Sequence, residues 1–176
     1  MSAAPGPDSW RPMRAADVPA VMRLADIVHP SFFEGASVFH DRLALFPEGQ
    51  WVLPGGPGLD LAGYAVSYPA RLGAPPPLDT VLGALPRDAD SLYIHDVALA
   101  PAFRGRRLAE PVIRRLLALA GPRPAMLVSV YGTAPFWERF GFGERQDPSL
   151  RAKIASYGAD AVFMTRGSGQ EKMARD

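Results

Sequence analysis

The chain has 176 residues, of which 48% are hydrophobic and 21% charged, with a formal net charge of +1 and no cysteine; this length suits one domain with a single core. The charge balance excludes the strongly basic class of nucleic-acid binders, and the lack of cysteine excludes disulfide frameworks, thiolate metal sites and cysteine nucleophiles. No stretch approaches the roughly 18 apolar residues of a membrane span, so we expect a cytoplasmic globular protein without a membrane partner.

Both ends of the chain have the composition of disordered tails. Residues 1–9 are small, polar and proline-bearing, and residues 167–176 are glycine, serine and charged residues, so the expected single domain spans 10–166. Near its start, Asp17 is a candidate N-cap for a helix with apolar residues at helical spacing. Pro30 predicts where that helix ends.

A second helix is expected at 37–46, followed by strands at 50–53 and 61–69. The Gly-Gly-Pro-Gly sequence between the strands is a turn signal, so the strands should form an antiparallel hairpin. Residues 69–90 are rich in proline and have little periodicity, which predicts a long loop with one helical turn at 78–85. Loops of this length inside a compact domain are commonly functional.

The second half of the chain alternates strands and helices, which favours a right-handed βαβ unit. Pro111 lacks an amide hydrogen, so the helix that contains it should begin its regular hydrogen bonding late or be kinked in its first turn. Gly141 marks the end of a shorter helix. The expected elements are a strand at 91–100, a helix at 106–120, a strand at 125–131, a short helix at 134–140 and a last strand at 161–166.

The junction at 97–109 is the most informative segment of the chain. An apolar strand leads through a short loop into a helix start that carries Arg104, Gly105, Arg106 and Arg107. Free amides at a helix N-terminus attract anions, and glycine permits a tight backbone path there. The junction therefore predicts a phosphate-binding site.

The same segment resembles the signature of the GCN5-related N-acetyltransferase superfamily, which reads Arg or Gln, two residues, Gly, one residue, then Gly or Ala. Arg104 and Ala109 match it, and Gly105 fits the usual Arg-Gly start of the signature. Arg107, however, occupies the place of the second glycine. Residues 134–142 and 161–164 resemble two further family segments, and 10–17 resembles the opening strand and helix cap. The resemblance extends over nearly the whole expected domain.

The resemblance implies an α/β fold with a mixed, mostly antiparallel central sheet flanked by helices and a βαβ core that binds acetyl-CoA as cosubstrate. It implies that the pyrophosphate lies on the amides of 104–109 and that the pantetheine arm pairs with Val97 and Leu99. The Leu99 amide is then the expected oxyanion donor. The implied cofactor-binding set is Val97, Ala98, Leu99, Arg104, Gly105, Arg106, Arg107, Leu108, Ala109, Phe136 and Trp137.

Three side chains are candidates for proton transfer. His95 is the expected proton acceptor, because an imidazole titrates near the operating pH, and Tyr93 shares its face of the strand by alternation. The family's usual general acid is a tyrosine, and Trp137 stands in its place, so Tyr131 is the substitute donor. The alternative reading is a hydrogen-bonded structural histidine and a packing tyrosine. Asp96 is expected to support the opposite face unless a bulge redirects it.

The expected activity is acetyl transfer from acetyl-CoA to a primary amine of a small molecule or peptide. The alternative is a non-catalytic acyl-CoA-binding or regulatory module, favoured by Arg107 and Trp137. The walls of an acceptor pocket should come from 29–40 and 69–90. No metal-ligand spacing is present among the three histidines, a nucleic-acid partner is disfavoured, and strand edges allow a homodimer.

Overall fold

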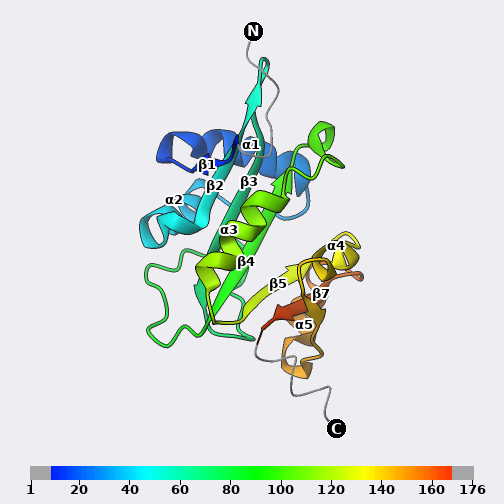
Figure 1. The fold of residues 1–176 in the computed structure, drawn as a ribbon. Coiled ribbons are helices and arrows are strands. Elements are labelled where there is room, and N and C mark those ends of the chain that lie inside the picture. The colour runs from blue at the N-terminus through cyan, green and yellow to red at the C-terminus, as the bar shows by residue number, and fades with distance from the viewer. Residues whose placement is uncertain (1–8, 168–176) are drawn as a thin grey trace.

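The structure, a computed structural model, describes residues 9–167, so the two expected tails lie outside the described residues except for Ser9 and Gly167. Within this range seven strands form one sheet in the order β1-β2-β3-β4-β5-β7-β6, and helices flank it (Figure 1). The strands are β1 (Arg11–Pro12), β2 (Gln50–Gly56), β3 (Leu59–Ala70), β4 (Ser91–Leu99), β5 (Ala125–Ser129), β6 (Gly143–Glu144) and β7 (Val162–Arg166). The helices are α1 (Val18–Val28), α2 (Ala36–Leu45), α3 (Glu110–Ala120), α4 (Ala134–Glu138) and α5 (Arg151–Ala155).

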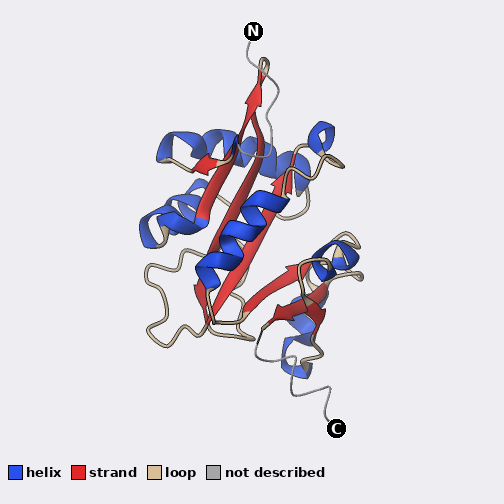
Figure 2. Ribbon diagram, in the orientation of Figure 1, coloured by secondary structure: helices blue, strands red, loops and turns tan. Residues whose placement is uncertain are grey.

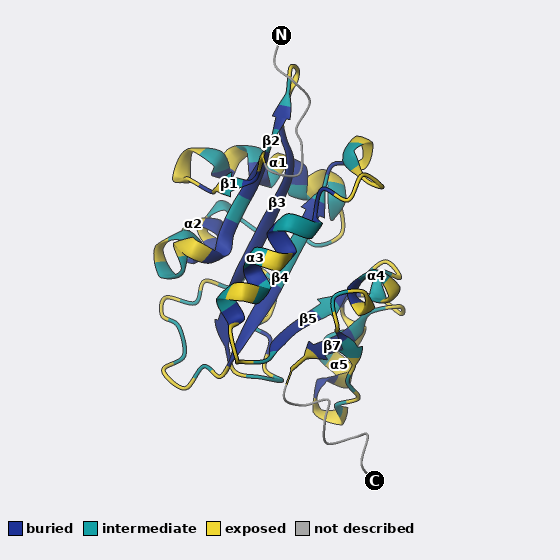
Figure 3. Ribbon diagram, in the orientation of Figure 1, coloured by how far each residue is buried: buried dark blue, intermediate teal, exposed yellow. Residues whose placement is uncertain are grey.

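Helices cover both faces of the sheet (Figure 2). One apolar core lies between α3 and the sheet and includes Leu92 and Ile94 of β4. The other lies between α1 and α2 and the opposite face, and it includes Tyr93 and Ala98 of the same strand. The central strands are therefore buried on both sides, as Figure 3 shows. Among residues 9–167, no helix has both the length and the apolarity needed to cross a membrane.

Strands β4 and β5 form the parallel pair of an otherwise antiparallel sheet, which confirms the expected fold class. They pair only at Leu92 with Ala125 and at Tyr93 with Met126, and β5 then continues toward its antiparallel partner β7. Beyond these two pairs the strands separate (Figure 1). The carboxyl-terminal part of β4 therefore has backbone groups along one edge that no strand covers.

A β-bulge interrupts the pairing of β4 with β3. Val66 pairs with Asp96, but the next residue of β3, Ser67, pairs with Ile94. His95 is thus the extra residue on β4, and a bulge of this kind redirects the side chains around it.

The bulge shifts the alternation of side chains along β4 by one residue. Tyr93 lies on the α1 face before it, and Ala98 lies on the same face after it, whereas Val97 and Leu99 pack on the α3 face. Asp96 therefore lies on the face of Tyr93, with its carboxylate bonded to Tyr64 of β3. Asp96 was expected on the opposite face unless a bulge redirected it, and the structure has that bulge.

Several expected element boundaries are wrong. The helix expected from residue 106 begins at Glu110, because Gly105 and Arg107 have φ angles of +73° and +57°, which no right-handed helix accepts. The helical turn expected at 78–85 is absent there. This segment is instead held in an irregular conformation by Asp41, which accepts hydrogen bonds from the amides of Leu82 and Gly83.

Other differences concern segments with weak patterns. The short elements β6 and α5 were not expected, whereas β1 lies within 10–17, the segment that resembles the family's opening strand. Strand β5 ends at Ser129 rather than at residue 131. Asp17 does precede α1, but its side chain accepts a hydrogen bond from the Arg14 amide, in the turn before the helix, and pairs with Arg11. It therefore caps the preceding 3-10 turn instead of α1.

Candidate active site

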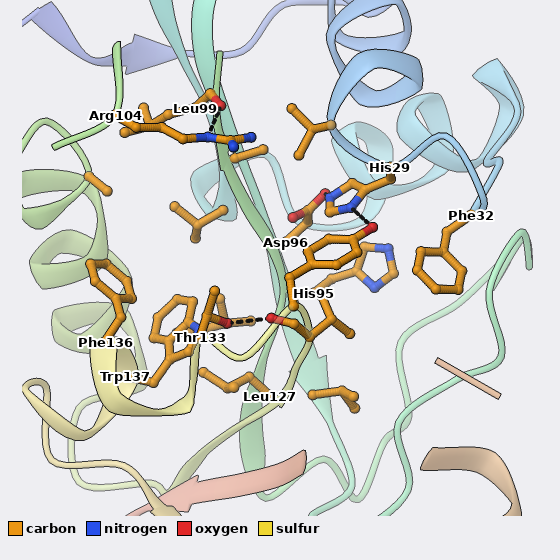
Figure 4. A pocket seen from close by; sticks show the side chains of 18 of the residues that line it. His29, Phe32, His95, Asp96, Leu99, Arg104, Leu127, Thr133, Phe136 and Trp137 are labelled. Atoms are coloured by element: carbon orange, nitrogen blue, oxygen red, sulfur yellow. Dashed lines mark hydrogen bonds and ion pairs between the residues drawn. The ribbon is translucent and has the colours of Figure 1, made fainter. Parts of the chain in front are cut away.

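A cavity of about 890 Å³ opens where β4 and β5 separate. Its walls come from both strands, from the loop between β4 and α3, from α4, and from the segment that follows α1. Figure 4 shows Phe136 and Trp137 on one side of this cavity and His29, Phe32 and Asp96 on the other. The cavity therefore joins the loop expected to bind phosphate to the wall expected to hold an acceptor.

The loop before α3 presents a row of free amides. In the described part of the chain, no hydrogen bond uses the amide groups of residues 105 to 109. The first bonds of the helix start later, with the Glu110 amide on the Arg107 carbonyl and the Ile113 amide on the Ala109 carbonyl. Such a row at a helix start suits an anion. It coincides with the expected phosphate-binding residues.

The arginines of this loop have different surroundings. The Nε atom of Arg107 donates to Oε1 of Glu110 at 3.0 Å, and Arg139 donates to the same oxygen at 2.9 Å. Arg106 lies over the ring of Phe103. The Glu110 carboxylate thus holds two guanidinium groups beside the loop before α3. Arg107, Glu110 and Arg139 all line the cavity.

The uncovered edge of β4 faces the cavity with its backbone. The Ala100 amide donates to the Ala62 carbonyl of β3 at 2.8 Å. Because backbone groups of alternate residues point to opposite edges of an antiparallel strand, those of Val97 and Leu99 point away from β3. Arg104 donates from Nε to the Leu99 carbonyl at 3.2 Å on that side (Figure 4). The edge expected to pair with a pantetheine arm is therefore accessible.

Trp137 is part of the apolar core as well as of the cavity wall. Its side chain is 8% exposed and packs against Phe136, Phe140 and Phe142. An indole N–H donates a hydrogen bond but supplies no proton under ordinary conditions. The position resembling the family's general acid is therefore filled by a packing residue.

His95 lies beside the carboxylate of Glu34, a residue expected only as part of the acceptor wall. Its Nε2 atom is 2.5 Å from Oε1 of Glu34, and its buried Nδ1 atom makes no hydrogen bond with any of residues 9–167. Oε2 of Glu34 accepts the Asp79 amide at 3.1 Å. Burial alone would raise the pKa of Glu34, but His95 and this amide hold it below the usual range.

Tyr93 lies next to His95, with ring centroids 5.6 Å apart in an edge-to-face arrangement. Burial raises the pKa of this phenol well above its ordinary value, and the neighbouring phenols of Tyr157 and Tyr68 add to the effect. Tyr93 therefore remains protonated at neutral pH and can act only as a neutral hydrogen-bonding group.

A second histidine, His29, lies at the end of α1 and joins the site through Asp96. Its Nε2 atom is 2.9 Å from Oδ2 of Asp96, and its Nδ1 atom is 3.1 Å from the Tyr131 hydroxyl. The Tyr64 hydroxyl donates to the same Oδ2 atom at 2.5 Å. Four side chains from four elements or loops thus form one hydrogen-bonded chain.

Burial and pairing act in opposite directions on the two charged members of this chain. Burial alone would lower the pKa of His29, but Asp96 raises it above 6.5. Burial alone would raise the pKa of Asp96, but hydrogen bonds from His29 and Tyr64 hold it below 3.8. Both shifts favour a charged pair.

His29 and Glu34 were not predicted as individual site residues, but only as part of the segment 29–40 expected to form the acceptor wall. A helix terminus followed by Pro30 does not indicate which strand the histidine will meet. Tyr131 was expected at the end of a strand, but it lies in a turn with a φ angle of +57° and is 51% exposed. Its hydrogen bond to His29 and its stacking on that ring fix its position.

Solved structures share this fold at low sequence identity. Ard1 from Thermoplasma volcanium is 16% identical, over 89% of this chain and 95% of that chain, with a TM-score of 0.64. Naa50 from Arabidopsis thaliana, in complex with the bisubstrate analogue CoA-Ac-MVNAL, is 12% identical over 91% and 98%, with a TM-score of 0.64. The loading GNATL domain of CurA from Lyngbya majuscula is 12% identical over 90% and 96%, with a TM-score of 0.70.

This is the fold of the GCN5-related N-acetyltransferases. The likeness is carried by structure alone, since no family model and no curated protein sequence matches the chain. In this N-acetyltransferase fold, the signature resemblance falls on the loop before α3, and Arg107 keeps the left-handed backbone at the place of the second glycine. A positive φ angle is the reason that the signature favours glycine there.

Proposed function

We propose that the protein is an acetyl-CoA-dependent N-acetyltransferase that acetylates a primary amine of a small molecule or peptide. The observation that carries this proposal is the meeting of two backbone surfaces at one cavity, the free amides of 105–109 and the β4 edge at Val97 and Leu99, which no described strand covers. A pyrophosphate suits the first surface, and an amide-containing arm suits the second. Solved structures of the same fold are complexes with CoA.

The side chains and backbone groups present fit this cosubstrate. The residues from Arg104 to Ala109 would hold the pyrophosphate, and Ala98 lies between the two residues that would pair with the pantetheine arm. Phe136 and Trp137 form the apolar wall beside it. When bound, acetyl-CoA would supply an acyl group activated as a thioester. The Leu99 amide would then donate a hydrogen bond to the oxygen that gains charge during transfer.

His95 is the proposed proton acceptor. A primary amine is a nucleophile only when it is neutral, and it must lose a second proton once the C–N bond forms and the C–S bond breaks. Glu34 holds the imidazole through Nε2, so Nδ1, which has no hydrogen-bond partner among residues 9–167, is the atom left to accept a proton. Tyr93 extends this hydrogen-bonding environment as a neutral phenol.

Tyr131 is the proposed donor to the departing sulfur, in place of the tyrosine that Trp137 replaces. Its hydroxyl is held by His29, and its side chain lines the cavity. His29 and Asp96 position it and keep a charged pair beside it. A thiolate is a good leaving group, so this donor accelerates the reaction without being indispensable.

Calorimetric titration with acetyl-CoA, with dephospho-CoA and a plain nucleotide as controls, tests the binding step. Micromolar binding of acetyl-CoA together with release of free thiol in the presence of an amine supports the proposal. Binding without thiol release across a broad set of amines would instead support a non-catalytic acyl-CoA-binding module. Absence of acetyl-CoA binding would refute both.

A further inference from the structure

The cationic side chains of the cavity lie in the loop before α3 and at the end of α4. Among the described residues that line the cavity, the only arginine or lysine side chains are those of Arg104, Arg107 and Arg139. Two of these bind Glu110, and Arg104 binds the Leu99 carbonyl. None of the three makes a hydrogen bond or ion pair with the wall that follows α1.

That wall contains the two buried carboxylates of Glu34 and Asp96. Both oxygens of Glu34 have partners, Nε2 of His95 and the Asp79 amide. In Asp96, Oδ2 accepts two hydrogen bonds, whereas Oδ1 accepts none from the residues between 9 and 167. The side chain of Asp96 is 18% exposed, into the cavity that it lines. One carboxylate oxygen is therefore available to a ligand.

Aromatic rings line the same cavity as Asp96 on the acceptor side. Phe32 lies 6.3 Å from the ring of Tyr131 and 6.1 Å from that of Tyr157, and Tyr131 stacks on His29. At the rim, Ile27 is 62% exposed and lines the cavity. The wall thus offers apolar and π surfaces around a single anionic acceptor atom.

We infer that the acceptor is a primary amine carried on an aromatic or apolar body that has no carboxylate or phosphate of its own. The ammonium group of the incoming amine binds Oδ1 of Asp96, and the body packs against Phe32 and Tyr131. Among the described residues of that wall there is no arginine or lysine, and His29 and His95 are already paired with Asp96 and Glu34. A ligand carboxylate would therefore meet carboxylates without a free cation to bind, which disfavours free amino acids as acceptors. This inference rests on the proposed function and narrows its acceptor.

Three related acceptors test the role of charge. Phenethylamine, phenylalanine methyl ester and phenylalanine share a ring and an amine, but only phenylalanine has a carboxylate. We expect kcat/KM for phenethylamine to exceed that for phenylalanine by about 100-fold, and the ester to recover most of that difference. Spermidine, which has no aromatic or apolar body, serves as the comparison acceptor and should be poorer than phenethylamine.

The substitution Asp96→Asn tests the anchoring oxygen. It should raise KM for phenethylamine by about tenfold or more while the calorimetric Kd for acetyl-CoA stays unchanged. The control Tyr64→Phe removes the hydrogen bond to Oδ2 but leaves the charge of Asp96, so its KM should change much less. Phe32→Leu should raise KM for phenethylamine more than for butylamine.

The outcomes separate this inference from the proposed function. Equal use of phenylalanine and phenethylamine, or better use of spermidine than of phenethylamine, would overturn the acceptor class while transferase activity stands. If no acceptor is acetylated, binding of phenethylamine to the CoA-loaded protein is measured directly. Binding that Asp96→Asn abolishes would retain the acceptor site and refute transfer, and lack of binding would overturn the inference.

Discussion

Nε2 of His95 and Oε1 of Glu34 lie 2.5 Å apart, although the two residues come from the bulge of β4 and from the segment between α1 and α2. The carboxylate fixes the orientation of the imidazole and also accepts the Asp79 amide of the long loop. One side chain thus links the proposed base to the loop that forms the acceptor wall.

The pair gives the first prediction. His95→Gln should lower kcat by roughly 100-fold to 10,000-fold, the usual range for loss of a general base, with the Kd for acetyl-CoA unchanged. Glu34→Gln should lower kcat less than His95→Gln does, because the imidazole remains but loses the carboxylate that orients it. A steady-state rate for His95→Gln equal to that of the natural chain would rule out His95 as the proton acceptor.

The second prediction concerns the pH dependence of stability. The pKa of His29 is raised by Asp96, so the folded protein binds more protons at this site than the unfolded chain near and above pH 6.5. The stabilisation is therefore complete below the unfolded pKa and is lost as pH rises through the folded value. The pKa of Asp96 is lowered, so its contribution is present above its unfolded pKa and is lost as pH falls through the folded value.

Urea unfolding between pH 6 and 8 measures this effect. The free energy of unfolding of the natural chain should fall with pH in that range, and His29→Gln should reduce the slope. His40→Gln is the matched control, since that histidine lies on α2 and does not line the cavity. An equal slope in the His29 and His40 variants would contradict the pairing.

The third prediction concerns the strained residue of the phosphate loop. Arg107 has a φ angle of +57°, a conformation that costs a residue with a side chain roughly 1 to 2 kcal/mol. Arg107→Gly removes this strain but increases the freedom of the unfolded chain, so we expect the free energy of unfolding to rise by about 0.5 to 1 kcal/mol. Its ion pair with Glu110 is largely exposed and contributes little.

Arg106→Gly is the control for this measurement, because Arg106 is also exposed and does not have a positive φ angle. It should lower the free energy of unfolding or leave it unchanged. Chemical denaturation of the two variants side by side checks the difference. Destabilisation by Arg107→Gly equal to that by Arg106→Gly would show that the left-handed conformation stores no strain.

The fourth prediction concerns the proposed proton donor. Tyr131→Phe keeps the ring that stacks on His29 and contacts Phe32, so KM for the amine should not change. Loss of the hydroxyl should lower kcat by about tenfold, less than a typical general-acid effect because a thiolate leaves readily. An unchanged kcat under conditions where acetyl transfer limits the rate would exclude Tyr131 as the donor.

The sequence predicted the order of the main strands and helices and the loop before α3 with its free amides, because these depend on local patterns. Glycine and arginine before an apolar stripe define the loop, and Pro111 correctly indicated a late helix start. The boundary itself was wrong by four residues, since the left-handed conformation of Arg107 is not evident from an arginine in the sequence.

The acceptor side was much less predictable, because it is assembled from contacts distant in sequence. His29 and Asp96 are 67 residues apart, and His95 and Glu34 are 61 residues apart. Nothing in the local pattern of β4 revealed the bulge, and strand alternation alone placed Asp96 on the wrong face. Only the partner strand, through the pairing of Val66 and Ser67, determines where the extra residue lies.

The bulge at His95 also divides β4 into two parts whose side chains alternate in different phases. Under the proposed function, residues 93–96 would help to select the acceptor, whereas Val97 and Leu99 keep the phase that would serve the acyl donor. Substitutions at 93–96 would then change the accepted amine without disturbing the edge at Val97 and Leu99. Deletion of the extra residue would reverse the phase of the preceding segment and turn polar groups toward the core beneath α3.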